Sequence, residues 1–188
     1  HDYRTEGNEE FYQYAFKSML RKIKAPKGSV FLDAGCGSAS HSIRLAEFGY
    51  QVEAIDFSEN VLEAARDKVK RMGLESQISL SQGNNCDLKF DDESYEYVMS
   101  WGVLMHIPDM EKAVEELARV VKKGGYLVLS ENNQHSLETT LMVMMKKSET
   151  QLKQVPHGLE FWKPYGDDEL VVRLTNIKWL IEKLKQEG

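Results

Sequence analysis

The stretch from residue 30 to residue 40 constrains the fold of this chain more than any other. It reads Val-Phe-Leu-Asp-Ala-Gly-Cys-Gly-Ser-Ala-Ser: apolar residues, one carboxylate, then glycines and small residues. A strand buried on both faces of a parallel sheet shows such an apolar run without alternation. Gly35 and Gly37 then permit backbone angles, and a close approach to a ligand, that a Cβ atom would block. The stretch predicts a buried parallel strand that turns into a helix, with a ligand at its carboxyl end.

The residues around the two glycines distinguish between classes of ligand. A dinucleotide fingerprint has the pattern G-x-G-x-x-G, which brings a pyrophosphate to a helix N-terminus. Here the third position is Ser40, and Asp33 places a negative charge two residues before the first glycine. A carboxylate at this point disfavours a pyrophosphate and favours a cationic ligand.

Composition and charge indicate one globular domain. A chain of 188 residues can bury a self-sufficient core, and its 41% hydrophobic and 29% charged residues are ordinary for a soluble protein. The net charge of −6 supplies no general field for phosphates, which counts against a nucleic-acid partner. Two cysteines fit a reducing compartment, and no apolar run approaches the roughly 20 residues that span a membrane. We expect a cytoplasmic protein without a membrane partner.

Strands and helices alternate along the next hundred residues. The sequence predicts further strands at 51–56, 78–81, 95–100 and 126–129, and apolar and polar residues alternate in the second of these. Helical spacing predicts helices at 9–24, 40–48, 59–72 and 109–121. Asp109 is a suitable N-cap for the last of these helices. This rhythm indicates βαβ units, and therefore an α/β fold with a doubly wound, mostly parallel sheet and helices on both faces.

The pattern loosens after residue 131. A Met-rich stretch over 136–147 has helical spacing, and the aromatic segment over 156–165 reads as a loop. Apolar residues spaced by four and three predict a last amphipathic helix within 167–188.

Four of these segments together resemble the class I S-adenosylmethionine (SAM) dependent methyltransferases. Asp33-x-Gly35-x-Gly37-x-Ala39 is similar to their motif I, with Ala39 where a third glycine is common. Asp56 ends the second strand 19 residues after Gly37, and the loops after the third and fourth strands follow in order. The resemblance covers roughly residues 28–131. It implies the Rossmann-like fold of that family, with SAM across the carboxyl ends of the first strands.

The resemblance also implies which residues contact SAM. Asp56 would accept hydrogen bonds from the ribose hydroxyls, at the interval expected of a ribose-binding acid. Phe57 would pack on the adenine, or else on the following helix. Asn84 stands where many relatives carry an acid that holds the adenine amino group, although Gly-Asn-Asn also suits a simple turn. The predicted cofactor-binding residues are Asp33, Ala34, Gly35, Cys36, Gly37, Asp56, Phe57, Asn84, Asn85, Cys86, Ser100 and Trp101.

His106 is the candidate catalytic residue. It lies in the loop after the fourth strand, and an imidazole with an ordinary pKa near 6.5 suits a general base or a substrate contact. A structural histidine near the start of the next helix is the alternative. His135 and His157 are weaker candidates, and the spacing of the histidines indicates no metal site.

The resemblance suggests a division of the single domain and a question about its end. We expect an N-terminal helix over 1–27, a cofactor-binding core over 28–131, a substrate lid over 132–166 and a C-terminal helix over 167–188. Relatives continue the sheet with a sixth strand and an antiparallel seventh. Here we expect that hairpin to be absent, because the chain is cut short or because this member lacks it.

The implied reaction is transfer of the SAM methyl group to a nucleophile. The protein mainly has to align donor and acceptor and exclude water. A small-molecule acceptor is favoured, because no signature for DNA or glutamine methylation, such as Asn-Pro-Pro-Tyr, is present. Three alternatives stay open: an RNA or protein methyltransferase, a nicotinamide oxidoreductase, and a non-catalytic SAM-binding protein or truncated fragment.

Overall fold

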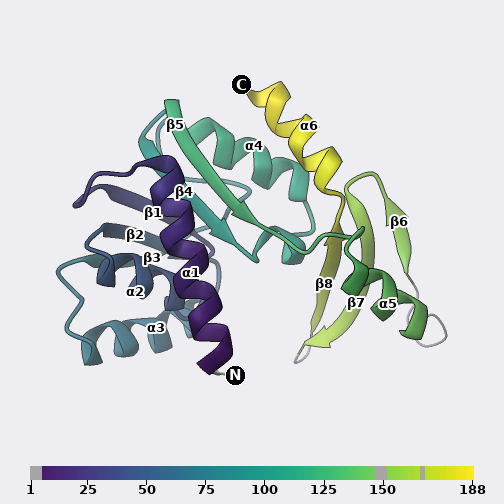
Figure 1. The fold of residues 1–188 in the computed structure, drawn as a ribbon, viewed down its shortest axis with the longest axis horizontal. Coiled ribbons are helices and arrows are strands. Elements are labelled where there is room, and N and C mark those ends of the chain that lie inside the picture. Colours follow the sequence, from purple (N-terminus) through teal and green to yellow (C-terminus); the bar gives the residue numbers. More distant parts are fainter. Residues whose placement is uncertain (1–5, 147–151, 166–167) are drawn as a thin grey trace.

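A five-stranded parallel sheet forms the centre of the computed structural model, which describes residues 6–146, 152–165 and 168–188 (Figure 1). Its order is β3-β2-β1-β4-β5, and each neighbouring pair is parallel. The strands are β1 (Val30–Ala34), β2 (Gln51–Asp56), β3 (Ile78–Gln82), β4 (Tyr95–Trp101) and β5 (Val121–Ser130). Strand order reverses between β1 and β4, so the carboxyl ends of these strands flank a crevice.

Helices cover both faces of this sheet, as predicted. The helices of the described residues are α1 (Glu6–Ile23), α2 (Ser40–Glu47), α3 (Glu59–Arg71), α4 (Met110–Val120), α5 (Leu137–Lys146) and α6 (Ile177–Glu187), with a 3₁₀ turn, η1 (Leu104–His106). Asp109 caps α4, because its side chain accepts a hydrogen bond from the Lys112 amide at 3.1 Å.

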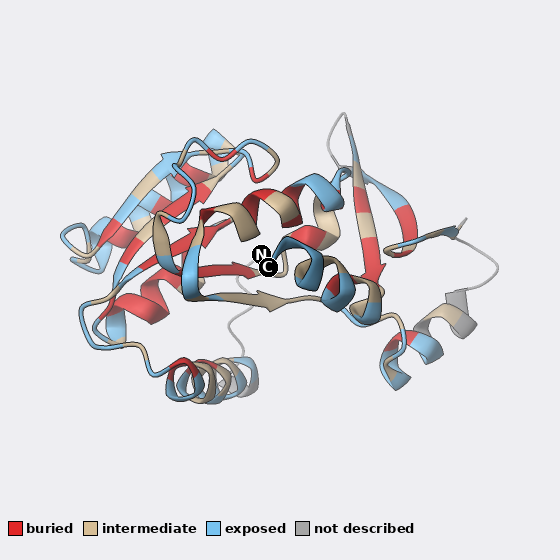
Figure 2. Ribbon diagram, turned by 90° about the horizontal axis from the view of Figure 1, so that it is seen from above, coloured by how far each residue is buried: buried red, intermediate tan, exposed pale blue. Residues whose placement is uncertain are grey.

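Two apolar cores, one on each face, hold the layers together. The first packs α1, α2 and α3 against the sheet and includes the fully buried Phe16, Ile43 and Leu62. The second packs α4 and α6 against the opposite face and includes Met110 and Leu117. In Figure 2 the buried residues accordingly follow the sheet and the inner sides of its helices. Burial on both faces explains why the strands read as apolar runs.

The fifth strand begins earlier than predicted. The sequence indicated a turn at Gly124 and Gly125 before a strand at 126, whereas β5 starts at Val121. The pairing with β4 shifts register between Tyr95 and Tyr97, so the two glycines form an irregularity inside the strand. Gly124 has a φ of +79°, which glycine adopts without strain.

The segment after residue 152 differs most from the predictions. The predicted loop over 156–165 and the first half of the predicted helix over 167–188 form a three-stranded antiparallel sheet. Its strands are β6 (Lys153–Val155), β7 (Gly158–Tyr165) and β8 (Asp168–Thr175), in that order. The helix is α6 alone, which starts after Asn176, whose side chain accepts from the Trp179 amide. Spacing of four and three was misleading here, because Val171, Val172 and Thr175 favour strand.

The antiparallel sheet lies beside the parallel sheet at the end where β5 finishes (Figure 1). Residues 132–134 join the two, since the Thr175 amide donates to the Asn132 carbonyl at 2.8 Å and the Gln134 amide to the Thr175 carbonyl at 3.0 Å. Among the described residues, the parallel sheet contains no strand after β5. In the same residues, no helix is both long and apolar enough to cross a lipid bilayer.

Ala39 provides the first test of this fold. It is fully buried, with φ +57° and ψ 22°, at the position where motif I commonly has glycine. A β-branched side chain is strained in this region and would overpack the core. We expect Ala39→Val to lower the free energy of unfolding by about 2–4 kcal/mol in urea denaturation.

Two companion variants make this measurement specific. Ala39→Gly should stay within about 1 kcal/mol of the wild type, because glycine accepts a positive φ. Ala64→Val, at an exposed position of α3, should cost only about 0.6 kcal/mol through helix propensity. An Ala39→Val cost as small as that of Ala64→Val would show that the backbone at residue 39 is not left-handed.

Candidate functional site

The glycine-rich turn after β1 is held by the end of β2. The amides of Gly35 and Cys36 both donate to the Ile55 carbonyl at 2.8 Å, and the Gly37 amide donates to Asp56 Oδ2 at 2.8 Å. Asp56 Oδ1 accepts from the Ser58 amide at 3.0 Å. Each carboxylate oxygen can accept a further hydrogen bond, so Asp56 remains able to bind ligand hydroxyls.

Asp33 lies beneath this turn and is 1% exposed. Ser42 Oγ donates to its Oδ2 at 2.5 Å. Burial raises the pKa of Asp33 to about 7, against the effect of the Ser42 hydrogen bond, and the nearby Asp56 charge adds to the rise. Burial likewise raises the pKa of the Cys36 thiol, which argues against a reactive thiolate.

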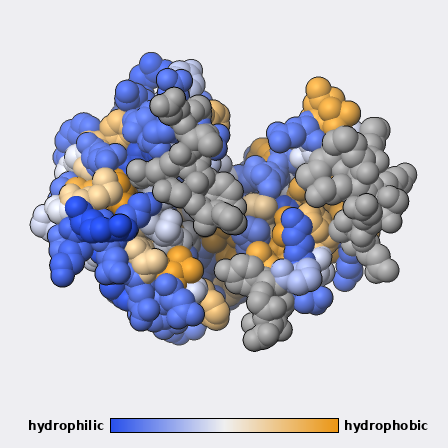
Figure 3. All heavy atoms as spheres, turned by 90° about the horizontal axis from the view of Figure 1, so that it is seen from below, coloured by the Kyte–Doolittle hydropathy of each residue, from blue (hydrophilic) through white to orange (hydrophobic). Residues whose placement is uncertain are grey.

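A cavity of about 580 Å³ opens over the turn, within the range of small-molecule sites. Its lining comes from α1, the turn, α2, α3 and the start of the loop after β4. Figure 3 views the molecule from the side of the α1 N-terminus. Hydrophilic atoms cover most of the described surface there, and hydrophobic atoms lie in separate groups between them.

Aromatic and basic side chains form one wall of this cavity. Of these residues, the sequence analysis named Trp101 but not His41 or Arg44. His41 lies 5.0 Å from the Tyr12 ring and 5.3 Å from the Trp101 ring, centroid to centroid. Arg44 stacks over Tyr12 and binds Glu9 through two contacts of 2.8 and 2.7 Å. Lys68 and Arg71 of α3 also line the cavity, so cations outnumber the acids there.

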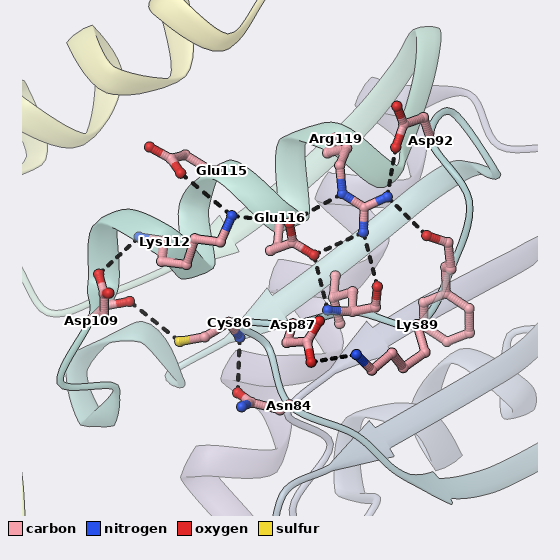
Figure 4. A network of polar contacts seen from close by, with 12 residues as sticks. Asn84, Cys86, Asp87, Lys89, Asp92, Asp109, Lys112, Glu115, Glu116 and Arg119 are labelled. Carbon is pink, nitrogen blue, oxygen red and sulfur yellow. Dashed lines mark hydrogen bonds and ion pairs between the residues drawn. The ribbon is translucent and has the colours of Figure 1, made fainter.

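The loop after β3 is fixed mainly by its own contacts and by α4 (Figure 4). Asn84 Oδ1 accepts from the Cys86 amide at 2.9 Å, which is a turn contact. Asn85 is buried and donates to the Ala34 carbonyl at 3.2 Å, and Cys86 Sγ donates to the Asp109 carbonyl at 3.5 Å.

The loop after β4 closes the opposite side of the site. Ser100 is fully buried and donates to the Ala34 carbonyl at 3.0 Å, while Trp101 and Val103 line the cavity. His106 is half-buried, and its Nδ1 lies 3.0 Å from the Val171 carbonyl. Because a carbonyl only accepts, Nδ1 carries the proton and Nε2 is the basic position of the neutral ring.

The predicted residues thus take different places. Asp33, Gly35, Cys36, Gly37 and Trp101 line the cavity. Asp56 braces the turn, and the Asn85 and Ser100 side chains converge on the Ala34 carbonyl. Phe57 is 74% exposed. Phe57, Asn84, Cys86 and His106 are not among the cavity-lining residues of the described chain. The cofactor-binding or catalytic role of every predicted site residue, including those that line the cavity, stays a prediction.

Comparison with known proteins identifies the family. A methyltransferase domain model matches residues 32–129, more than half of the chain. The chain therefore belongs to the methyltransferase domain family. The predicted resemblance to class I SAM-dependent methyltransferases is confirmed.

Two curated relatives share sequence with this chain over more than half of its length. The chain is 37% identical over 124 residues to demethylmenaquinone methyltransferase of Bacillus cytotoxicus. The aligned segment covers 64% of this chain and 52% of that protein. The Bacillus subtilis enzyme of the same name is 38% identical over 118 residues, 61% of this chain and 50% of that one. The chain thus spans about half the length of these curated relatives.

Solved structures confirm the predicted fold class. A Pyrococcus horikoshii protein has a TM-score of 0.76 at 20% identity and covers 98% of this chain and 84% of that one. A SAM-dependent methyltransferase of Methanosarcina mazei has a TM-score of 0.68 at 24% identity, covering 90% of this chain and 82% of that one.

Gly35 tests the contact between the turn and the loop after β4. A Cβ atom at Gly35, whose φ is +91°, would lie 2.4 Å from Val103 Cγ1. Gly28 has a similar φ of +83° with nothing within 4 Å of a Cβ, so Gly28→Ala is a matched control. We expect Gly35→Ala to cost about 1–3 kcal/mol more unfolding free energy than Gly28→Ala, through overpacking. Adding Val103→Ala should recover part of that difference. Equal costs at the two glycines would contradict the contact.

Asp33 predicts a pH dependence of stability. Its pKa rises from an ordinary value of 3.8 to about 7 in the folded protein. Between these values the folded state holds more protons on Asp33, so the contribution of Asp33 to the free energy of unfolding is largest below pH 3.8 and is lost as the pH rises through about 7. Asp33→Asn should make this fall shallower in urea titrations at successive pH values.

Glu131 supplies a second contribution with the same sign. Burial raises its pKa to about 7 as well, although the amides of Leu104, Met105 and Val103 oppose the rise. The free energy of unfolding of the Asp33→Asn/Glu131→Gln double variant should therefore depend less on pH than that of either single variant. An unchanged slope in Asp33→Asn would show that Asp33 ionises normally in the folded state.

Proposed function

We propose that this chain binds SAM in the cavity over the glycine-rich turn and transfers its methyl group to a small molecule. The observation that carries this is the hydrogen bond from the Gly37 amide to Asp56. It joins the motif I turn, which lines a cavity of suitable size, to the acid predicted to bind the ribose, within the segment that matches the family. The glycine-rich turn and the Asp56 carboxylate would both contact SAM.

The acids at the glycine-rich turn fit the positive charge of the cofactor. When bound, SAM supplies a methyl group already activated on a sulfonium centre. Asp33 and Asp56 place carboxylates below and beside the turn, and Gly35 and Gly37 leave the backbone open to a close approach. Trp101 and Tyr12 flank the cavity and help to exclude water from the reacting groups.

A small-molecule acceptor is supported by the relatives and by the cavity. The curated relatives are named for a quinone substrate. Tyr12, His41 and Trp101 line the cavity and offer ring surfaces on which a flat acceptor can pack. Demethylmenaquinone is accordingly the first acceptor to assay, with formation of S-adenosylhomocysteine and label in the quinone as readouts. Cofactor binding without transfer to any acceptor would favour the non-catalytic alternative.

Cofactor binding is tested by calorimetric titration with S-adenosylhomocysteine, the product. We expect binding to the wild type, no binding of NADH, and at least a tenfold loss of affinity in Asp56→Ala. Tenfold corresponds to about 1.4 kcal/mol, in keeping with loss of charged hydrogen bonds. Asp67→Ala, at an exposed position on α3, is the control and should bind like the wild type. Binding of NADH, or equal affinity in both variants, would refute the proposed site.

A further inference from the structure

A carboxylate from the segment after β5 holds the start of the loop that follows β4. Glu131 accepts hydrogen bonds from three consecutive amides: Val103 at 3.2 Å, Leu104 at 3.0 Å and Met105 at 3.0 Å. These amides begin η1, so they have no partner within the turn. Ionised or not, a carboxyl group supplies the oxygen acceptors that they need.

A guanidinium from the antiparallel sheet holds the end of the same loop. Arg173 of β8 is fully buried and donates to the carbonyls of Leu104, Ile107 and Pro108 at 2.8, 2.9 and 3.2 Å. Its charge is balanced by Glu160 of β7, with contacts of 2.8 and 2.6 Å. Such charge-assisted bonds in a dry environment fix geometry strongly.

The loop held in this way forms part of the cavity. Val103 packs directly over Gly35, and Trp101 and Gly102 line the cavity with it. His106 adds a second attachment to β8 through the Val171 carbonyl. The loop therefore lies between two charged anchors on one side and the glycine-rich turn on the other.

We propose that Arg173 and Glu131 are positioning residues for the cofactor site, so that the antiparallel sheet sets the shape of the cavity. Neither side chain lines the cavity, and both act on it through the backbone of residues 103–108. The consequence for ligand affinity rests on the proposed function. The consequence for the loop does not.

The chain contains a matched control for this proposal. Arg119 of α4 donates to the carbonyls of Leu88 and Phe90 at 2.9 Å, and Glu116 accepts from the Leu88 amide at 2.9 Å (Figure 4). This pair holds the loop after β3 in the same manner. Arg119→Met thus removes a comparable set of bonds from a different loop.

Amide hydrogen exchange followed by mass spectrometry tests the loop without any ligand. Arg173→Met should speed exchange in residues 102–108 and in the glycine-rich turn, whereas Arg119→Met should speed it in residues 88–92. Glu131→Gln is the second variant, because it removes no buried cation and leaves the Arg173–Glu160 pair intact. The glutamine side chain keeps one acceptor oxygen in place of two, so exchange should speed at one or more of the Val103, Leu104 and Met105 amides. Unchanged exchange of the loop in folded Arg173→Met or Glu131→Gln would overturn the proposal.

Titration with S-adenosylhomocysteine tests the effect on the site. At a temperature where thermal melting shows each variant fully folded, we expect Arg173→Met and Glu131→Gln to bind about tenfold more weakly than the wild type. Wild-type affinity in a variant whose loop exchanges faster would overturn the proposed control of the cavity. A wild type that does not bind this ligand would refute the proposed function, and exchange would still decide whether the two residues hold the loop.

Discussion

The glycine-rich turn depends on acceptors that the next strand supplies. The amides of Gly35, Cys36 and Gly37 point out of β1, where no intrastrand partner exists, and an unpaired buried amide is costly. The Ile55 carbonyl and the Asp56 carboxylate accept all three. This pairing works only if β2 lies beside β1 and ends at the same level, which the parallel register provides. The neighbouring crevice, where β4 takes the other side of β1, follows from the same arrangement.

The sequence predicted the parallel sheet well, because burial on both faces leaves an unambiguous signal. Val52, Ala54 and Ile55, and Val98 and Met99, are buried apolar residues in segments between turn residues, and the structure has strands at both. The sequence analysis did not predict the antiparallel sheet. There, Leu170 and Leu174 fit a helical spacing, while the pairing of β8 with β7 that decides the structure joins residues up to 17 positions apart, as in Gly158 with Thr175. Spacing along one segment carries no information on such pairing.

The candidate site divides in the same way. Residues on the turn and on the strand ends, such as Asp33 and Asp56, were predictable because their positions are fixed by local sequence order. The wall built by Tyr12, His41 and Arg44 was not, because it forms only when α1 packs on α2. Arg44 finds Glu9 at a separation of 35 residues, and no motif announces that contact. The one signal in the sequence is an arginine within the helix that follows motif I. The structure shows that this arginine, Arg44, is buried, which is rare for a charged residue.

Two loops that follow strands of the parallel sheet raise a common physical problem. Each leaves regular structure and then has backbone groups without partners near an apolar core. In both, an arginine serves the carbonyls and a glutamate serves the amides: Arg119 and Glu116 after β3, Arg173 and Glu131 after β4. The first pair lies within α4 of the core, whereas the second draws on β8 and the segment after β5. A buried guanidinium needs a counter-charge, because an unpaired charge is costly away from water. Glu160 of β7 supplies this charge to Arg173 of β8, so both strands have to pack against the loop. The antiparallel sheet is for that reason part of the architecture of the site.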